Sequence, residues 1–521
     1  MNNLKNIKLF PDPNLLLRSF IRLIFIIPLT IALNITTSSV IAVNTWSPQE
    51  RVPVYDDSTE PPYMVADQNQ TVHAFASQWV GEGEGNPEVA IVYNQWSLER
   101  GWTVPIDILL SPLNHFAWVQ DAHLDQTGTI HIIFFGGNNI EANIYYSRAP
   151  AIKANDAKSW SIPVLAGGGA TTNNAAAFIA DDHGRFYILY GGNRDGNGLY
   201  AASSIDGGDT WTTPTPIYST NDDKFPYGLQ MYLGQSDWIH AIWNVVTPGG
   251  QGREIYYSRM KVGDTQWSEP IKLAEAQTGY GTNTPTIIEH KGNVFAIYNM
   301  TPKITMRRSE DGGQTWSNPV VLFSRHVGVN GILSLVIDSS DNLHLFFGQR
   351  IPGIGSPDIH GMWHSIWLAG YWSEPEAVVS GPAVMSGEKS FDPYNARAVV
   401  SQGNVILVTW RTDPGNGIEN ENGVWYSYLV LDTPELPIMP LPIMKSTKTS
   451  IPTTATEVIP KLSLTVKPES VSIDPSVNGS TDLFLSSNPA ELLIVSMIPV
   501  CLIISMIMFR FFFVRRNRQQ Y

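Results

Sequence analysis

Short runs of alternating apolar and polar residues recur along the middle of the chain, and they predict β-strands. One strand-like segment returns seven times, as TVHAF at 71, TIHII at 129, RFYIL at 185, WIHAI at 238, NVFAI at 293, NLHLF at 342 and NVILV at 404. A second segment follows each copy, as VAIVY at 89, NIYYS at 143, GLYAAS at 198, EIYYS at 254, KITMR at 303, GMWHS at 361 and GVWYS at 423. Such self-similarity is typical of repeat folds.

A third signature, Trp followed by Ser or Thr, is displaced in one copy. Six copies follow the strand pairs, at Trp102, Trp160, Trp211, Trp267, Trp316 and Trp372. The seventh precedes all of them, in TWSPQERVPVY at 45–55. A ring of four-stranded blades explains this displacement, because the N-terminal segment can supply the outer strand of the last blade. We therefore predict an all-β fold, a seven-bladed β-propeller closed by its N-terminal strand, with a six-bladed ring and a spare hairpin as the alternative.

The N-terminus carries the features of a targeting segment. Lysines and arginines precede the apolar run LIFIIPLTIAL at 23–33, and VIA at 40–42 has the small-residue character of a cleavage site. These parts predict a signal peptide over residues 1–42, with an uncleaved anchor as the alternative. In either case we expect the following residues to leave the cytoplasm.

The C-terminus predicts a membrane anchor. The apolar run at 492–509 is followed by arginines, which indicates a single transmembrane helix over 491–514 and a basic cytoplasmic tail over 515–521. Residues 432–490 are rich in Pro, Ser and Thr and predict a disordered stalk. The propeller, residues 43–431, is thus expected outside the cytoplasm, on a single-pass anchor at the cell membrane.

Composition excludes several kinds of site. The net charge of −14 argues against nucleic-acid binding, and the single cysteine, Cys501, excludes an intrachain disulfide and a cysteine-held zinc. NRDGNG at 193–198 resembles the start of a calcium loop, but Ser204 stands where the loop needs its glutamate. Four histidines share one repeat position with Tyr, Phe and Ile, which predicts packing: His73, His131, His240 and His344. We expect no metal and no cofactor.

Two near-identical stretches predict tight turns between strands. They are SSIDGGDTWTTP at 203–214 and RSEDGGQTWSNP at 308–319. The Asp can accept backbone N–H bonds, the second Gly can adopt a positive φ, and the Trp offers an apolar face. These turns resemble the Asp-box of the sialidase or BNR-repeat superfamily of β-propellers.

That resemblance covers the ring only. In the superfamily the turn joins the third and fourth strands on the face opposite the active site, which implies a structural role here. The residues concerned are Ser204, Asp206, Gly208, Thr210, Trp211, Ser309, Asp311, Gly313, Thr315 and Trp316.

Long polar loops on the other face of the predicted ring carry the candidate chemistry. Guanidinium groups in these loops suit a carboxylate or sulfate on a sugar. The candidate substrate-binding residues are Arg194, Arg350, Arg397 and Arg411. In sialidases three arginines hold the substrate carboxylate, a Tyr with a Glu acts as nucleophile, and an Asp supplies the acid. The resemblance implies these catalytic roles for Tyr394, Glu388 and Asp392.

The chain departs from the sialidase pattern in its first innermost strand. The family opens this strand with a motif close to Arg-Ile-Pro, whereas PPYMVA at 61–66 has no arginine. The similar residues Arg51, Val52 and Pro53 fall on the predicted outer strand instead. Sialic-acid hydrolysis therefore lacks one expected arginine, and another anionic glycan remains open.

Three functions follow from these patterns. The first is a membrane-anchored, cell-surface, sialidase-like propeller that recognises an acidic glycan and, if it is an enzyme, hydrolyses it. Aromatic residues of the second strands favour it: Trp79, Tyr190, Trp243, Tyr298 and Trp410. The alternatives are a noncatalytic propeller that binds a cell-surface protein or serves in assembly, and a polysaccharide lyase that uses His115 and Tyr227.

Overall fold

The computed structural model describes residues 45–83, 86–138, 140–172, 174–220, 224–276, 281–328, 331–349, 359–382, 392–412 and 422–441. The predicted signal peptide, transmembrane helix and basic tail lie outside these residues, as do Arg350 and Glu388. Within the described part of the chain, no helix is long and apolar enough to cross a membrane.

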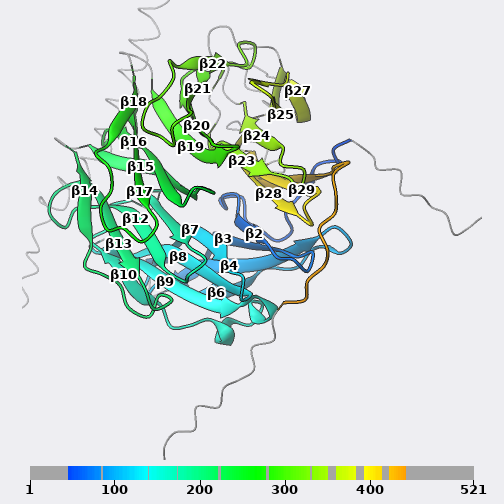
Figure 1. Ribbon diagram of the computed structural model, residues 1–521. Helices are drawn as coiled ribbons and strands as arrows, with labels where there is room; N and C mark the ends of the chain where they lie inside the picture. The colour runs from blue at the N-terminus through cyan, green and yellow to red at the C-terminus, as the bar shows by residue number, and fades with distance from the viewer. Residues whose placement is uncertain are drawn as a thin grey trace, which may run out of the picture. The chain divides into compact units, whose positions relative to one another are not determined.

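The fold is all-β, as predicted, and strands that follow one another along the chain pair side by side in antiparallel sheets (Figure 1). The described strands form six sheets, one of which has nine strands and joins two strand groups, β2–β6 and β7–β10, through a parallel pairing of β4 with β7. The first strands of the strand groups are β2 (Tyr63–Ala66), β7 (Phe116–Leu124), β11 (Ala176–Ala180), β15 (Phe225–Leu233), β19 (Thr282–His290), β23 (Ser334–Ile337) and β28 (Pro393–Ser401). The second strands are β3 (Val72–Gly83), β8 (Thr129–Gly137), β12 (Phe186–Gly192), β16 (Trp238–Val246), β20 (Asn293–Met300), β24 (Leu343–Gly348) and β29 (Val405–Thr412).

The third strands are β4 (Asn86–Ser97), β9 (Ala142–Pro150), β13 (Gly198–Ser204), β17 (Gly252–Lys261), β21 (Lys303–Ser309), β25 (Ile359–Leu368) and β30 (Gly423–Val430). The outer strands are β5 (Gly101–Trp102), β6 (Ile106–Leu109), β10 (Val164–Gly168), β14 (Thr215–Ser219), β18 (Ile271–Glu275), β22 (Val320–Leu322), β26 (Tyr371–Trp372), β27 (Glu376–Pro382) and β1 (Glu50–Arg51). Two 3-10 turns, η1 (Ala151–Lys153) and η2 (Ala157–Ser159), precede β10.

The first strands lie next to one another around a common centre. Each contacts the first strand of the next strand group, from β2 through β7, β11, β15, β19 and β23 to β28, and β28 in turn contacts β2. The outer strands β10, β14, β18 and β22 lie toward the edge in Figure 1. Radial sheets around one centre are the arrangement of a β-propeller.

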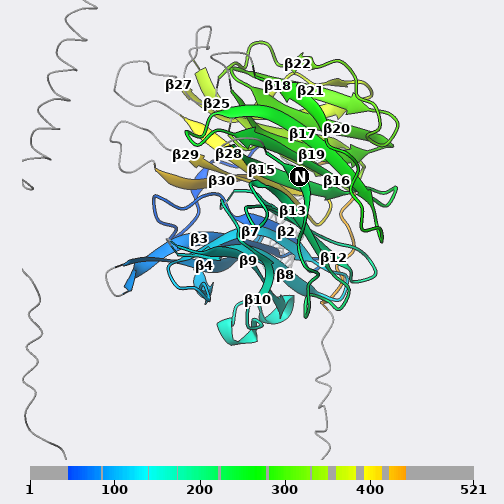
Figure 2. The ribbon, with the colours of Figure 1, turned by 90° about the vertical axis from the view of Figure 1, so that its left-hand side faces the viewer.

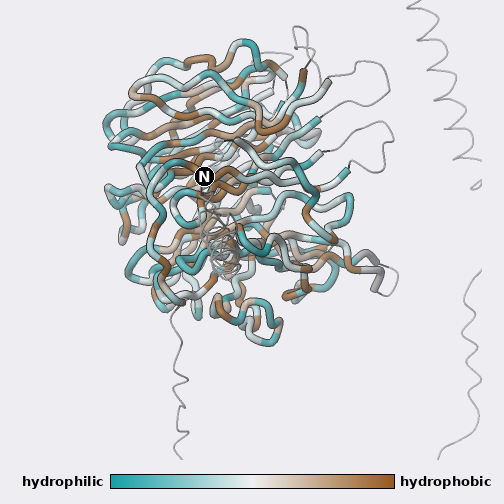
Figure 3. Tube along the Cα trace, turned by 90° about the vertical axis from the view of Figure 1, so that its right-hand side faces the viewer, coloured by the Kyte–Doolittle hydropathy of each residue, from teal (hydrophilic) through white to brown (hydrophobic). Residues whose placement is uncertain are grey.

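The core lies between neighbouring sheets, and the second strands form most of it. Hydrophobic and hydrophilic stretches alternate along the chain (Figure 3), and second strands such as β12 and β16 are almost entirely buried. Both faces of these strands are covered, so their apolar residues are buried whichever way they point. Four of the five aromatic residues expected to support glycan binding are therefore core residues, at most 1% exposed: Tyr190, Trp243, Tyr298 and Trp410. The prediction that they lie near an open face is wrong for these four.

The histidines at the shared repeat position are buried and hydrogen-bonded. His73 contacts the Tyr93 hydroxyl through Nδ1 at 2.6 Å and Asp67 through Nε2 at 3.2 Å. His131 repeats this arrangement with a Tyr and an Asp, and His240 with a Tyr and a Glu. His344 has a histidine as its Nδ1 partner instead of a tyrosine. These partnerships fit the packing role that the sequence suggested.

The two repeated turns each join a third strand to an outer strand. In the first, Asp206 accepts the backbone N–H of Thr210 at 2.9 Å, and the Ser204 hydroxyl accepts the N–H of Gly208 at 2.9 Å. Hydrogen bonds from Thr210 hold the pKa of Asp206 low, at about 2. Gly208 has φ +91°, and a Cβ there would collide with the ring of Tyr146. Both the Asp and the Gly are thus required by the turn itself.

The N-terminal segment pairs with the last strand of the chain. In the register of β1 and β30, Glu50 faces Tyr426, and the Val52 N–H donates to the Val424 carbonyl at 2.9 Å. Trp46 packs edge-on against Phe346, with ring centroids 5.8 Å apart. These contacts tie residues 46–52 to strands that lie far away in sequence.

The segment after β30 also lies against the sheets. The Leu436 N–H donates to the Gln402 carbonyl at 2.7 Å, and the Met439 N–H to the Gln68 carbonyl at 2.9 Å. Leu436 and Met439, in the first part of the stretch expected to form a stalk, therefore have backbone partners in turns that connect strands.

Candidate functional site

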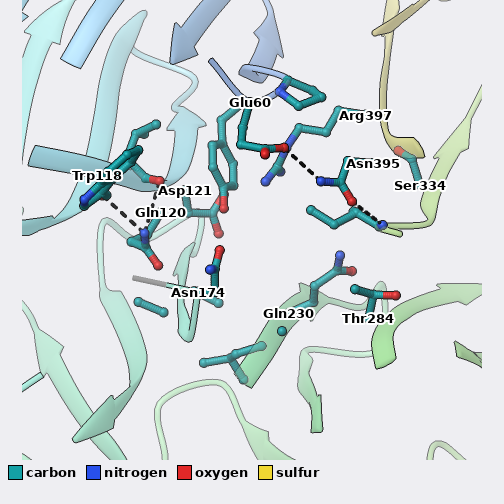
Figure 4. Close-up of a pocket in the computed structure, with 18 of the residues that line it drawn as sticks. Glu60, Trp118, Gln120, Asp121, Asn174, Gln230, Thr284, Ser334, Asn395 and Arg397 are labelled. Atoms are coloured by element: carbon teal, nitrogen blue, oxygen red, sulfur yellow. Dashed lines mark hydrogen bonds between the residues drawn. The ribbon is translucent and has the colours of Figure 1, made fainter. Parts of the chain in front are cut away.

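A cavity of about 570 Å³ lies among the first strands (Figure 4). Every first strand contributes to its wall, together with the segment that leads into β2. Polar groups dominate the labelled side chains, which come from opposite sides and point toward a shared space: Glu60, Trp118, Gln120, Asp121, Asn174, Gln230, Thr284, Ser334, Asn395 and Arg397. Its volume is within the range of small-molecule sites.

β-Bulges in four first strands help to shape this cavity. The register shifts between Val119 and Asp121 in β7, and in β15, β19 and β28 at corresponding places. A bulge leaves a residue unpaired and turns the side chains next to it. The bulges thus interrupt the apolar alternation of the strands and direct Asp121, Gln230 and Arg397 to the cavity wall.

Left-handed backbone conformations accompany three of the bulges. Gly228 has φ 58°, Thr284 43° and Asn395 56°. Such a conformation is costly for a β-branched residue, so Thr284 needs support from its surroundings. Its hydroxyl donates to the Gly331 carbonyl at 2.6 Å and accepts from the Asn299 amide at 2.8 Å. Strain held by surrounding hydrogen bonds is common at functional sites.

Arg397 supplies the positive charge in the cavity wall. Its guanidinium carbon lies 3.5 Å from the centre of the Tyr63 ring, in a cation–π contact. Its Nε is buried and has no hydrogen-bond partner. Among the described residues, Arg397 forms no salt bridge within 4.0 Å. The guanidinium is therefore held in place by an aromatic face while its charge is not neutralised by a contacting carboxylate from those residues.

Asp121 supplies a carboxyl group with a raised pKa. Burial raises the pKa of Asp121 to about 6, although the N–H groups of Phe178 and Ala122 and the charge of Arg397 favour its ionised form. The two N–H groups donate to the carboxylate at 3.0 and 2.9 Å. Burial also raises the pKa of Tyr63, against the opposing effect of Arg397. An acid near neutral pH beside a cation and a phenol is an arrangement suited to proton transfer.

Glu60 forms part of the cavity wall and is held from two sides. Arg411 donates to Glu60 Oε1 at 2.8 Å, and the Asn395 amide donates to Oε2 at 2.8 Å. Arg411 also donates to the Ser58 carbonyl at 2.8 Å. Arg411 therefore orders the segment that precedes β2.

The structure brings together only some of the predicted site residues. Arg397 lines the cavity, and Arg411 donates a hydrogen bond to the lining residue Glu60. Tyr394 is 8% exposed and is paired in register with Arg411. Asp392 is buried and lies 3.1 Å from Nδ1 of His360. Neither Tyr394 nor Asp392 is among the residues that line the cavity.

Of the remaining candidate residues, one lines the cavity and two do not. Tyr227, proposed for a lyase, lines the cavity, but His115 is not among the lining residues and its ring lies beside Phe116. Arg194 is exposed in a turn and does not line the cavity.

The sequence analysis did not predict Tyr63, Glu60 and Asp121 as site residues, because it looked for function in long loops. These side chains come from strands and from the short segment that leads into β2. One signal was present: adjacent Gln and Asp interrupt the apolar pattern of FAWVQDAHL at 116–124.

No family model and no curated protein matches the chain. Among solved structures it is similar to a protein of unknown function from Dyadobacter fermentans, with 15% identity over 74% of this chain and 99% of that chain and a TM-score of 0.42. A polysaccharide lyase of the PL25 family, an ulvan lyase, gives 15% identity over 74% and 95%, with a TM-score of 0.45. The NanB sialidase from Streptococcus pneumoniae gives 12% identity over 75% and 70%, with a TM-score of 0.40. Sialidases are thus among the structures to which the chain is similar, as the resemblance predicted.

Proposed function

We propose that the described unit is a seven-bladed ring closed by residues 45–55, and that its central cavity binds an acidic glycan. Closure is supported by a serine contact that repeats from sheet to sheet. Ser161, Ser268 and Ser373 each follow a signature Trp and lie 3.2 Å, Oγ to Oγ, from a third-strand serine. Ser47, after Trp46, makes the same contact with a third-strand serine at 3.1 Å. The displaced N-terminal copy thus makes the contact that an outer segment of the last blade would make.

The observation that carries the proposed function is the state of Arg397. A guanidinium that lacks a contacting carboxylate among the described residues, in a cavity large enough for a sugar, suits an anionic group of a ligand. Amides and hydroxyls around it match the hydroxyl groups of a sugar, and Tyr63, Trp118 and Tyr227 offer apolar surface.

In the described part of the chain, the wall holds one cation, Arg397, and two carboxyl groups, of which Glu60 is paired with Arg411 and Asp121 is the other. A single cation among neutral polar groups and carboxyl groups suits one sugar carboxylate better than the several phosphate charges of a nucleotide, and the polar wall does not suit a lipid.

A catalytic role is a second candidate function, and it rests on Asp121. A carboxyl group with a pKa of about 6 can hold a proton near neutral pH and donate it to a leaving oxygen. Hydrolysis and β-elimination both need a proton for the leaving oxygen. β-Elimination also needs a base that removes the proton next to the sugar carboxylate, and a cation that neutralises the charge of that carboxylate. We therefore propose that the protein is a glycan-binding propeller, and that it cleaves its ligand if Asp121 acts as the acid. We also propose that it is anchored at the cell surface.

The experiment that tests this function is a glycan array probed with the purified full-length protein. We expect retention on glycans that contain sialic or uronic acids and none on their neutral counterparts. Spots that retain the protein would then be analysed for released fragments, which separates binding from cleavage. Equal retention on acidic and neutral glycans, or none on either, contradicts the proposal.

Acidification is expected to strengthen the binding of an acidic glycan. With a pKa of about 6, Asp121 is ionised at about pH 7.5 and mostly protonated at about pH 5, whereas a sugar carboxyl stays charged at both. Loss of the repelling carboxylate should raise the affinity as the pH falls. Asp121→Asn should bind at the higher pH as wild type does at the lower pH, with most of the pH dependence gone. Titration calorimetry at both pH values measures this, and weaker wild-type binding at the lower pH would count against it.

A further inference from the structure

The hairpin of β3 and β4 is longer than its counterparts, and it carries an exposed tryptophan. Each strand has 12 residues, and together they extend beyond the neighbouring strands (Figure 2). Trp79 of β3 is 41% exposed and the next residue, Val80, is 39% exposed. By contrast, three other tryptophans of the fold are among its largest fully buried side chains. An exposed tryptophan next to a cavity therefore needs a reason other than core packing.

Trp79 is the outer member of a group of three aromatic rings, which we call the aromatic patch. Its centroid lies 6.3 Å from that of Trp118, at an interplanar angle of 84°, and 6.4 Å from that of Phe116, at 89°. Trp118 lines the cavity, whereas Trp79 does not. The aromatic patch, Trp79, Phe116 and Trp118, is thus a continuous apolar path that leads out of the cavity.

The aromatic patch is held in place by the strands beneath it. The Val89 N–H donates to the His115 carbonyl at 2.7 Å, and Val89 pairs with Phe116 between β4 and β7. The Ser77 hydroxyl accepts the Val119 N–H at 2.8 Å, which joins β3 to the cavity wall. These bonds fix the backbone of the strands that carry the rings, and the rings pack on one another. Side chains ordered in this way lose less conformational freedom when a ligand binds them, which favours affinity.

We infer that the aromatic patch is a second binding position for the same glycan, taken by a sugar ring next to the acidic sugar in the cavity. The inference rests on the proposed function and deepens it by specifying an oligosaccharide rather than a single sugar as ligand. One face of a pyranose ring presents C–H groups, which pack on an indole face. The aromatic rings supply no charge of their own, so the position selects ring shape rather than charge. Continuity with the cavity through Trp118 argues for a sugar of the same chain over an unrelated partner.

The test compares short and long acidic chains on the full-length protein. The shorter probe is a single sugar, galacturonate, which fills the cavity alone, and the longer probe is hexagalacturonate. Sialic acid and hexasialic acid form a second pair, and all four are titrated into wild type and Trp79→Ala. We expect the longer member of the bound pair to bind wild type more tightly. Trp79→Ala should weaken the longer chain by about five- to tenfold, as loss of an aromatic contact does, and leave the shorter one unchanged. Trp79→Phe should retain most of the chain-length effect.

Tyr371→Ala is the matched control, because Tyr371 is a 64% exposed aromatic residue on the outer strand β26. It should change neither affinity. If short chains bind and chain length or Trp79→Ala has no effect, the inference is wrong and the proposed function stands. If neither pair binds wild type, both are wrong. If Trp79→Ala changes the oligomeric state in light scattering instead, the aromatic patch is a protein interface and the inference is overturned.

Discussion

Arg397→Ala is expected to weaken the binding of an acidic glycan by at least tenfold, to the point of abolishing it. A hydrogen bond to a charged group contributes about 1.5–3 kcal/mol, and a bidentate guanidinium–carboxylate pair at least that. The loss should appear in affinity and not in stability, because Arg397 makes no salt bridge within the described residues and its main contact is the Tyr63 ring. Titration calorimetry and a melting curve on the same samples separate the two effects.

Three control variants sharpen this prediction. Arg194→Ala should bind like wild type, since Arg194 is exposed outside the cavity. Asp206→Ala should lower stability, because Asp206 accepts the bonds that close its turn, and leave the affinity per folded molecule unchanged. Tyr63→Leu should weaken binding less than Arg397→Ala, because it removes the support of the guanidinium and leaves its charge. If Asp206→Ala abolishes binding in folded protein while Arg397→Ala does nothing, the site is on the other face.

Removal of residues 45–55 is expected to have the largest effect on stability. A chain that begins at Asp56 loses the pairing of β1 with β30, the buried side chains of Val52 and Tyr55, and the packing of Trp46. Burial of large apolar side chains contributes about 1.5–3 kcal/mol each, so the total approaches the stability of a whole domain. The shortened chain should aggregate or melt far below one that begins at Val43.

Point variants test which contacts of the N-terminal segment contribute to this stability. Trp46→Ala removes a ring that packs on Phe346 and His364 and donates to Glu376, and it should lower the melting temperature by several degrees. Ile205→Ala, which changes a side chain that is 84% exposed, should not. Equal melting temperatures for the two chain starts would contradict closure by the N-terminal segment.

The strand pattern could be predicted from sequence because it repeats. Segments such as TIHII and NIYYS became β8 and β9, and each predicted segment pair corresponds to a second and a third strand. The displaced Trp-Ser of the N-terminus was equally informative, since Trp46 and Ser47 pack against strands near the end of the described chain. Because the pattern repeats, a strand predicted in one copy can be checked against the other copies. A motif that occurs once offers no such comparison.

The site could be predicted only in part, and the reason lies in the bulges. Asp121 and Arg397 face the cavity because a bulge shifts the register of each strand by one residue, and no periodicity in a single sequence reveals such a shift. The same limit explains the misplaced aromatic residues. Trp243 and Trp410 lie in strands that are covered on both faces. Side chains on either face of such a strand are buried, so both tryptophans belong to the core. Trp79 is exposed and belongs to β3, whose hairpin with β4 extends beyond the neighbouring strands (Figure 2).

The most direct test of the central claim is a calorimetric comparison of one acidic oligosaccharide with its carboxyl-reduced form, in which each carboxylate has become an alcohol. Both forms share the sugar rings and the hydroxyl groups, so they differ only in the group that Arg397 is proposed to bind. We predict that wild type binds the acidic form at least tenfold more tightly and that Arg397→Ala removes this preference. Equal binding of the two forms by wild type would contradict an acidic-glycan site in the central cavity.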